Sequence, residues 1–161
     1  MTLAVVTRSA EETAALAQRV GALLRAGDVV VLAGQLGIGK TVFAKGIARA
    51  LGITEPVVSP SFTIVRQYDG GTLPLVHVDV YRLDHLQELH DIGFDDLVGG
   101  DAVTIVEWGD RVGSILPADR LEVSMLADAT DDDTRVVQFD ANGLMWSDRR
   151  DALAAAVGGD A

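Results

Sequence analysis

The segment at residues 34–41 constrains the fold of this chain more than any other feature. It reads GQLGIGKT and matches the pattern G-x-x-x-x-G-K-[ST]. An apolar run rich in β-branched residues precedes it at positions 29–33, which is typical of a strand buried on both faces. Apolar residues at helical spacing follow it from Phe43 to Leu51, and Gly52 is a suitable end for that helix. The sequence therefore predicts a strand, a tight loop and a helix in direct succession.

The residue types in this loop suit the binding of phosphate groups. Gly34 and Gly39 allow the backbone to bend tightly and to approach phosphate oxygens with no Cβ in the way. Successive backbone N–H groups would then point into one concavity at the positive end of the helix dipole. The residues expected to contact a nucleotide here are Gly34, Gly37, Ile38, Gly39, Lys40, Thr41 and Val42.

Two side chains of the loop predict a more specific ligand. Lys40 would place its charge between the β- and γ-phosphates, and the hydroxyl of Thr41 would ligate Mg²⁺. Small P-loop GTPases read guanine with an Asn-Lys-x-Asp element. This chain cannot build that element, because Asn142 is its only asparagine and Lys40 and Lys45 are its only lysines. ATP with Mg²⁺ is therefore the expected ligand.

Two acidic residues end apolar runs elsewhere in the chain. Asp79 follows the run at 75–78, and Glu107 follows the run at 103–106. Strand ends are where a parallel sheet presents side chains to its crevice, so both acids are candidates for the nucleotide site. Either could hold Mg²⁺ directly or through water, and either could orient the attacking water. We therefore expect Asp79 and Glu107 to act with Lys40 in catalysis and with Thr41 in metal binding.

A loop rich in hydroxyl groups lies at residues 59–63, where Pro60 stiffens a segment that carries Ser59, Ser61 and Thr63. One interpretation is a switch that senses the γ-phosphate or the attacking water. The other is a loop whose side chains bond to its own backbone, and the residues alone favour this one.

Two further side chains near the acids have a structural interpretation. His77 lies on the predicted strand before Asp79, and a lone strand histidine is typical of a satisfied core residue. Trp108 follows Glu107 and could simply cover the end of the sheet.

The remaining patterns predict an α/β fold. A helix is expected from Ser9, which has capping-box spacing to Glu12, to Leu24. Strands are expected at 62–68, 73–79, 102–107, 121–127 and 135–140, a short helix or irregular segment at 84–98, and a helix capped by Ser147 that ends at Val157. This order predicts a three-layer sandwich like that of P-loop NTPases, with a mixed sheet that has a parallel centre and antiparallel hairpin additions. We expect one domain over 1–161, with a C-terminal helix and tail from about residue 145.

Composition excludes several functions. The 161 residues include no cysteine, which excludes a disulfide scaffold, an iron–sulfur cluster and a thiol nucleophile. The net charge of −11 argues against unaided binding of nucleic acid, because that binding depends on neutralising phosphates. We find neither a membrane-spanning apolar run nor a signal-peptide pattern, so we expect a cytoplasmic protein with no membrane partner.

The chain resembles the TsaE family (also called YjeE), the small bacterial ATPases of tRNA threonylcarbamoyladenosine biosynthesis, from about residue 9 to about residue 143. The segments that carry the resemblance are GQLGIGKT at 34–41, SPSFT at 59–63, HVDVYRL at 77–83, ELHDIG at 88–93 and VEW at 106–108. The resemblance implies binding of ATP and Mg²⁺ and slow hydrolysis by the protein alone. It also implies action with TsaD and TsaB, which install a threonylcarbamoyl group on the adenosine next to the anticodon in tRNAs reading A-starting codons. Hydrolysis would reset that complex, and tRNA would be held by the partners.

The resemblance also implies residue roles. Lys40 would contact phosphates, Thr41 and Glu107 would hold Mg²⁺, and Asp79 would take the second acidic role. Arg135 has a family counterpart and is expected to be a weak ATP contact. In contrast to the reading from the residues alone, the resemblance makes switch candidates of Ser59, Ser61, Thr63 and Trp108.

Two positions depart from the family pattern. Gln35 stands where the family usually has Asp, which puts in doubt any role of that carboxylate in metal or partner contacts. Ser61 stands where Thr is common and keeps the hydroxyl.

Two other functions stay open on the sequence. A small-molecule kinase would need an arginine-rich lid, and the only clustered arginines are Arg149 and Arg150. A docking module that switches with its nucleotide but hardly hydrolyses it would carry the same loop.

Overall fold

A computed structural model describes residues 2–60, 65–81, 85 and 87–158. Its strands are β1 (Thr2–Thr7), β2 (Val29–Gly34), β3 (Val65–Tyr68), β4 (Leu75–Asp79), β5 (Val103–Glu107), β6 (Arg120–Ala127) and β7 (Arg135–Asn142). Its α-helices are α1 (Ala10–Gly21), α2 (Lys40–Ala50), α3 (Gln87–Asp91), α4 (Phe94–Leu97) and α5 (Arg150–Gly158). Two 3₁₀ segments are η1 (Gly109–Ile115) and η2 (Leu144–Arg149).

The strands form one sheet in the order β1-β7-β6-β2-β5-β4-β3. In its centre β2 pairs in parallel with both β5 and β6, and β4 pairs in parallel with β5. The antiparallel pairs are β1 with β7, β6 with β7, and β3 with β4. The predicted mixed sheet, with its parallel centre and antiparallel additions, is therefore confirmed.

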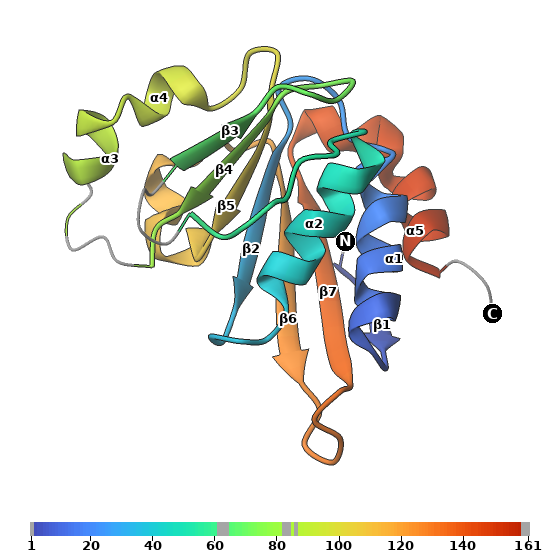
Figure 1. The fold of residues 1–161 in the computed structure, drawn as a ribbon. Helices are drawn as coiled ribbons and strands as arrows, with labels where there is room; N and C mark the ends of the chain where they lie inside the picture. Colours follow the sequence, from blue (N-terminus) through green and yellow to red (C-terminus); the bar gives the residue numbers. More distant parts are fainter. Residues whose placement is uncertain (1, 61–64, 82–84, 86, 159–161) are drawn as a thin grey trace.

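The two faces of the sheet are covered unequally (Figure 1). One face packs against α1, α2 and α5 and forms the larger core, which includes Leu16, Phe43 and Leu153. The other face packs against α3, α4 and η1, through Leu89 and Phe94 among others, and the strand residues of that core come from β2, β4 and β5. The second helical layer therefore covers only half of the sheet, and β6, β7 and β1 extend beyond it.

Local signals explain several element boundaries. Ser9 caps α1 as predicted, because its side-chain oxygen accepts a hydrogen bond from the backbone N–H of Glu12 at 3.1 Å. Helices α1 and α2 pack closely at Gly46, where an added Cβ would lie 2.5 Å from the Cβ of Ala17. This close approach holds α2 against the sheet directly behind the glycine-rich loop.

Some predicted boundaries were wrong. Ser147 does not cap a helix: it lies inside η2, where its hydroxyl donates to the Leu144 carbonyl at 2.7 Å, and α5 begins only at Arg150. Strand β1 was not predicted, and it exists because β7 offers it an antiparallel edge. The predicted strand at 62–68 is described only from Val65, since 61–64 lie outside the described residues.

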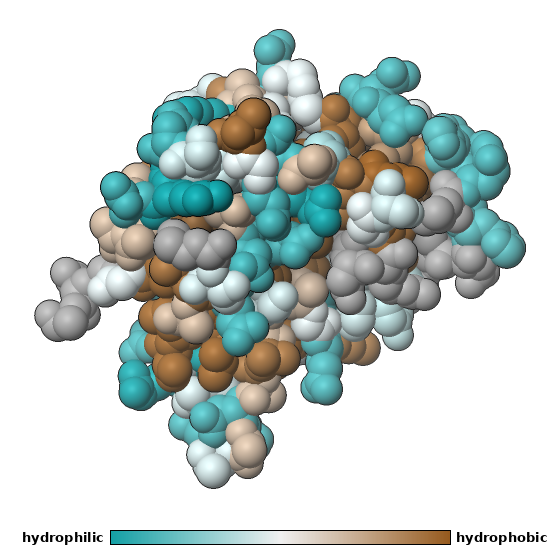
Figure 2. Space-filling model, turned by 180° about the vertical axis from the view of Figure 1, so that it is seen from behind, coloured by the Kyte–Doolittle hydropathy of each residue, from teal (hydrophilic) through white to brown (hydrophobic). Residues whose placement is uncertain are grey.

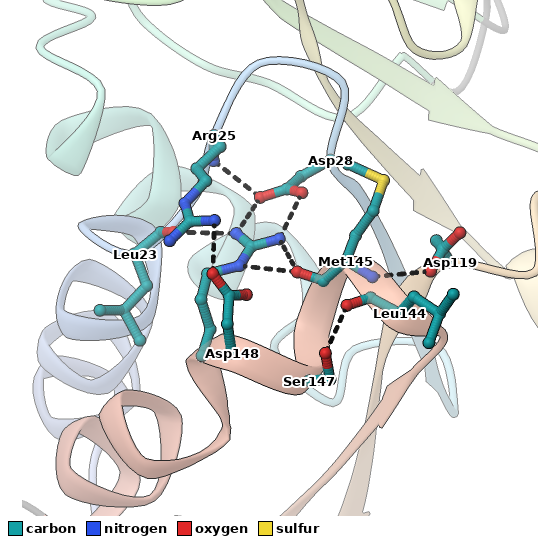
Figure 3. A network of polar contacts seen from close by, with 9 residues as sticks. Leu23, Arg25, Asp28, Asp119, Leu144, Met145, Ser147 and Asp148 are labelled. Atoms are coloured by element: carbon teal, nitrogen blue, oxygen red, sulfur yellow. Dashed lines mark hydrogen bonds and ion pairs between the residues drawn. The ribbon is translucent and has the colours of Figure 1, made fainter.

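A buried ion pair ties the C-terminal segment to the start of β2 (Figure 3). Arg149 donates from Nη1 to Asp28 Oδ2 at 2.6 Å and from Nη2 to Asp28 Oδ1 at 2.8 Å. The same guanidinium donates to the carbonyls of Leu23 and Met145 and lies over the Trp146 ring.

Within the part of the chain that the structure describes, no helix combines the length and the hydropathy that a membrane crossing requires.

Candidate nucleotide-binding site

The glycine-rich loop joins β2 to α2, as its sequence predicts. Gly34 has φ +148° and Gly39 has φ +119°, backbone conformations that residues with a side chain rarely adopt. A Cβ at Gly34 would also lie 2.8 Å from the Met125 carbonyl oxygen on the neighbouring strand β6. Both glycines are thus required by geometry, and α2 begins at Lys40 with its first N–H groups at the loop.

The side chain of Lys40 folds back over its own loop. Its Nζ donates to the carbonyl oxygens of Gly34 and Gln35 at 2.8 Å each. It also lies 3.9 Å from the centroid of the Trp108 ring, within the range of a cation–π contact. The charge of Lys40 is therefore held at the mouth of the loop, between the loop carbonyls and an aromatic face.

The two predicted acids lie side by side. Asp79 ends β4 and Glu107 ends β5, and the parallel register pairs these two residues directly. Both are largely buried, with 8% and 2% of their surface exposed. Two neighbouring carboxylates in a buried position attract a cation, because removing charge from water is costly unless it is compensated.

Hydroxyl groups connect the acids to the loop. The Ser59 hydroxyl lies 3.0 Å from Asp79 Oδ2 and 3.2 Å from Glu107 Oε2, so it can donate to either carboxylate. The Thr41 hydroxyl donates to Glu107 Oε1 at 3.5 Å, a long hydrogen bond. Of the predicted switch residues, Ser59 is thus placed beside both acids, while Ser61 and Thr63 lie outside the described residues.

His77 belongs to this group, although its sequence suggested only a core residue. Its Nε2 lies 3.0 Å from Glu107 Oε2, and its side chain is fully buried. Its Nδ1 has no hydrogen-bond partner among the described residues. The spacing to Asp79 could have revealed it, because residues two apart on a strand share a face.

Trp108 lines the larger cavity of the site next to Lys40. Its φ of +63° is the only positive value among the described residues other than glycine. Its ring packs on that of Tyr81, with centroids 4.8 Å apart, and the Tyr81 backbone N–H donates to Asp79 Oδ1 at 2.9 Å. Trp108 therefore contacts both the lysine of the loop and the aromatic residue after β4.

Two cavities meet at the loop. The larger, of about 410 Å³, is lined by Lys40, Thr41, Ser59, Asp79, Glu107 and Trp108 together with loop residues. The smaller, of about 150 Å³, lies on the other side of the loop, between Ile38 and Arg135. Arg135 donates from Nε to the Ile38 carbonyl at 2.8 Å, which places this predicted contact at the loop. Ser9 and Asp133 also line the smaller cavity and had no local signal to mark them.

The oxygen atoms of the larger cavity suit a hard cation. Thr41 Oγ1 and Glu107 Oε1 face each other, and Mg²⁺ prefers oxygen ligands while it keeps several waters. Among the residues the structure describes, no group of three or more His, Cys, Asp or Glu side chains could hold a metal by itself. A cation here would thus need oxygens from its ligand and from water as well as from the protein.

A comparison of the sequence with models of known protein families gives a match that covers these site residues. The family model described as "Threonylcarbamoyl adenosine biosynthesis protein TsaE" matches residues 7–137, which include the loop, both acids and Arg135. The chain belongs to the TsaE family.

Several curated members of the TsaE family are similar over most of their length. The Bacillus subtilis protein is 44% identical over 137 residues, covering 85% of this chain and 84% of its own. The Treponema pallidum protein is 48% identical over 120 residues, covering 74% and 88%. Both are named tRNA threonylcarbamoyladenosine biosynthesis protein TsaE. The crystal structure of Bacillus subtilis YdiB superimposes with a TM-score of 0.80 at 37% identity, covering 98% of this chain and 95% of that one.

Proposed function

We propose that this chain is a Mg²⁺-dependent ATPase that supports threonylcarbamoylation of the adenosine next to the anticodon in tRNAs reading A-starting codons. Membership of the TsaE family supports the pathway. The observation that carries the ATPase activity is one cavity of about 410 Å³ that joins the glycine-rich loop and Lys40 to the buried pair of Asp79 and Glu107.

The loop and its lysine would bind the phosphate groups. Backbone N–H groups at the start of α2 donate toward the loop, and the helix dipole favours negative charge there. Lys40 would exchange the carbonyls of Gly34 and Gln35 for phosphate oxygens, since both are acceptors for the same ammonium group. Ile38 and Arg135 border the smaller cavity, which would take the nucleoside end.

The acidic pair would manage the cation and the attacking water. Thr41 and Glu107 would hold Mg²⁺, which when bound neutralises charge on the phosphate oxygens. Asp79 would orient the water, because its Oδ1 is fixed by the Tyr81 N–H while Oδ2 faces Ser59. Ser59 would sense the ligand, because its hydroxyl lies within hydrogen-bond distance of both carboxylates and would lose one of these bonds when a carboxylate binds a cation.

TsaD and TsaB are the proposed partners, with the cytoplasm as the expected location. The net charge of −11 disfavours direct contact with the tRNA phosphates, so this chain would reach the tRNA only through those partners.

The test combines calorimetry with a hydrolysis assay on the wild type and three variants, Lys40→Ala, Glu107→Gln and Lys45→Ala. We expect Lys40→Ala to abolish ATP turnover and Glu107→Gln to weaken Mg²⁺-dependent binding. Lys45→Ala changes the chain's only other lysine, which is exposed on α2, and should behave as wild type. Unchanged hydrolysis by Lys40→Ala would refute the site. Nucleotide-dependent binding to TsaD–TsaB without hydrolysis would instead indicate a docking switch.

A further inference from the structure

The half of the sheet that lacks a second helical layer carries an apolar row. Leu121, Val123 and Met125 of β6 point into the larger core, so Leu126 points to the opposite face by strand alternation. The register pairs Leu126 with Val136 of β7 and pairs Val136 with Val6 of β1.

These three aliphatic side chains therefore lie next to one another across three strands. Cross-strand neighbours on one face have Cβ atoms about 5 Å apart, so the row Val6–Val136–Leu126 is continuous. Leu126 is 52% exposed, Val6 is 42% exposed and Val136 is partly buried. Figure 2 shows apolar side chains gathered on this face, at the lower left, above the loop between β6 and β7.

Beyond this row the open half of the face is polar apart from Ala4, as expected for a sheet surface in water. The next rows along the strands are Ala4, Gln138 and Ser124, and then Thr2, Asp140 and Glu122. Single exposed aliphatic residues are ordinary on a protein surface. A contiguous row of them on an otherwise polar surface is instead typical of an interaction site.

A compact acidic loop borders the apolar row. The loop joins β6 to β7 beyond the pair of Ala127 and Arg135, which follows the pair of Leu126 and Val136. It carries Asp128, Asp131, Asp132 and Asp133. It is ordered by its own hydrogen bonds: Asp128 accepts from the N–H and hydroxyl of Thr130, and Asp131 accepts from the N–H of Asp133 and the hydroxyl of Thr134. Hydrogen bonding of the charged forms lowers the pKa of Asp128 and of Asp131, so the loop keeps its negative charge near neutral pH.

Arg135 links the acidic loop to the glycine-rich loop at residues 34–41. Arg135 donates to carbonyls of Asp132 and Thr134 and also to the Ile38 carbonyl. Gly34 pairs with Met125, the residue before Leu126, and Leu36 at the tip of the nucleotide loop is 73% exposed. A partner that contacts the acidic loop would therefore be linked through Arg135 to the loop that is proposed to bind ATP.

We propose that the row Val6–Val136–Leu126 and the acidic loop at 128–133 form the docking surface for a partner protein. Charge complementarity defines that partner: its contact surface is apolar and is edged by Lys or Arg side chains. The acidic loop repels nucleic acid, which argues for a protein occupant. The choice of TsaD–TsaB as probe rests on the proposed function.

The test measures binding of the purified TsaD–TsaB complex from the same organism, by interferometry with saturating ATP and Mg²⁺. We expect Leu126→Asp and Val6→Asp to weaken binding at least tenfold. Leu144→Asp is the matched control, because Leu144 is 86% exposed but follows β7, beyond the opposite end of the sheet. It should bind as wild type. Circular dichroism and ATP calorimetry on each variant verify that the fold and the nucleotide site are intact.

A further substitution tests the charge. Asp132→Asn leaves the carboxylates of Asp128 and Asp131, which order the loop, in place. We expect a severalfold slower association at low salt that converges on the wild-type rate at high salt.

Each outcome has a distinct meaning. Equal binding by wild type and Leu126→Asp would overturn the docking surface and leave the proposed function intact. No binding of TsaD–TsaB by the wild type would overturn both the surface and the proposed partnership. A wild-type dimer in sedimentation that Leu126→Asp abolishes, with unchanged TsaD–TsaB binding, would assign the surface to a second copy of this chain and overturn the proposal.

Discussion

Replacement of Asp28 by asparagine would leave the charge of Arg149 uncompensated in the protein interior. The two side chains are 1% and 4% exposed and share two hydrogen bonds, so water screens their interaction poorly. Breaking a buried pair in this way costs about 3–5 kcal/mol. Arg149 would keep its hydrogen bonds to the carbonyls of Leu23 and Met145, so we expect a loss of unfolding free energy at the lower end of that range, about 3 kcal/mol. For a chain of this length that is a fall in Tm of about 6–12 °C.

The assay is urea and thermal unfolding followed by circular dichroism, with Asp148→Asn as the matched control. Asp148 pairs with Arg25 at 3.2 Å, but these side chains are 61% and 58% exposed. Exposed pairs contribute about 0–1 kcal/mol, so the control should unfold close to wild type. If Asp28→Asn does not fold, the double variant Asp28→Leu with Arg149→Met should recover folded protein, because it leaves no unpaired charge. Equal losses from Asp28→Asn and Asp148→Asn, within about 1 kcal/mol, would refute the reasoning.

Three further predictions concern the site and the acidic loop. Gly34→Ala should lower the free energy of unfolding in urea by about 1–3 kcal/mol and weaken ATP binding, because a φ of +148° and a carbonyl oxygen 2.8 Å from the added Cβ leave no room for a side chain. Gly70→Ala is the control: Gly70 has open space around it, so the same substitution there should change neither quantity. His77→Leu should reduce Mg²⁺ affinity in calorimetry about tenfold or more, because Glu107 loses the contact that fixes its carboxylate. His77→Gln restores a hydrogen-bond donor and should recover part of that affinity. Equal Mg²⁺ affinities of wild type and His77→Leu would contradict a positioning role for His77. In an NMR titration the pKa of Asp131 should lie below the ordinary value of about 3.9. Its contribution to stability is then fully present above that pH and is lost as the pH falls through the folded pKa, and a midpoint at or above the ordinary value would contradict the assigned hydrogen bonds.

The glycine-rich loop between β2 and α2 could be predicted from the sequence because its requirements are local. Gly34 and Gly39 adopt positive φ values that residues with a side chain rarely adopt. Ser9 caps α1 by a hydrogen bond to Glu12, only three positions away. Local patterns failed where the reason for an element is remote. Strand β1 depends on its pairing with β7, and Ser147 has the chemistry of a cap but lies inside η2.

The candidate site shows the same division. The sequence predicted that Asp79 and Glu107 lie at strand ends, because each follows a short apolar run. Their direct pairing depends on the parallel register of β4 and β5, which no local pattern reports. The place of His77 beside Glu107 follows from that same register.

Sequence alone determined the glycine-rich loop between a strand and a helix, the alternation of strands and helices, and the acidic character of the chain, because each depends on residue type and short-range spacing. Tertiary structure decided which half of the sheet stays open, which acids meet, and that Arg149 finds Asp28 across 121 positions of the chain. These choices depend on strand order and register, which are set by burial of apolar surface over the whole sheet rather than by any single segment.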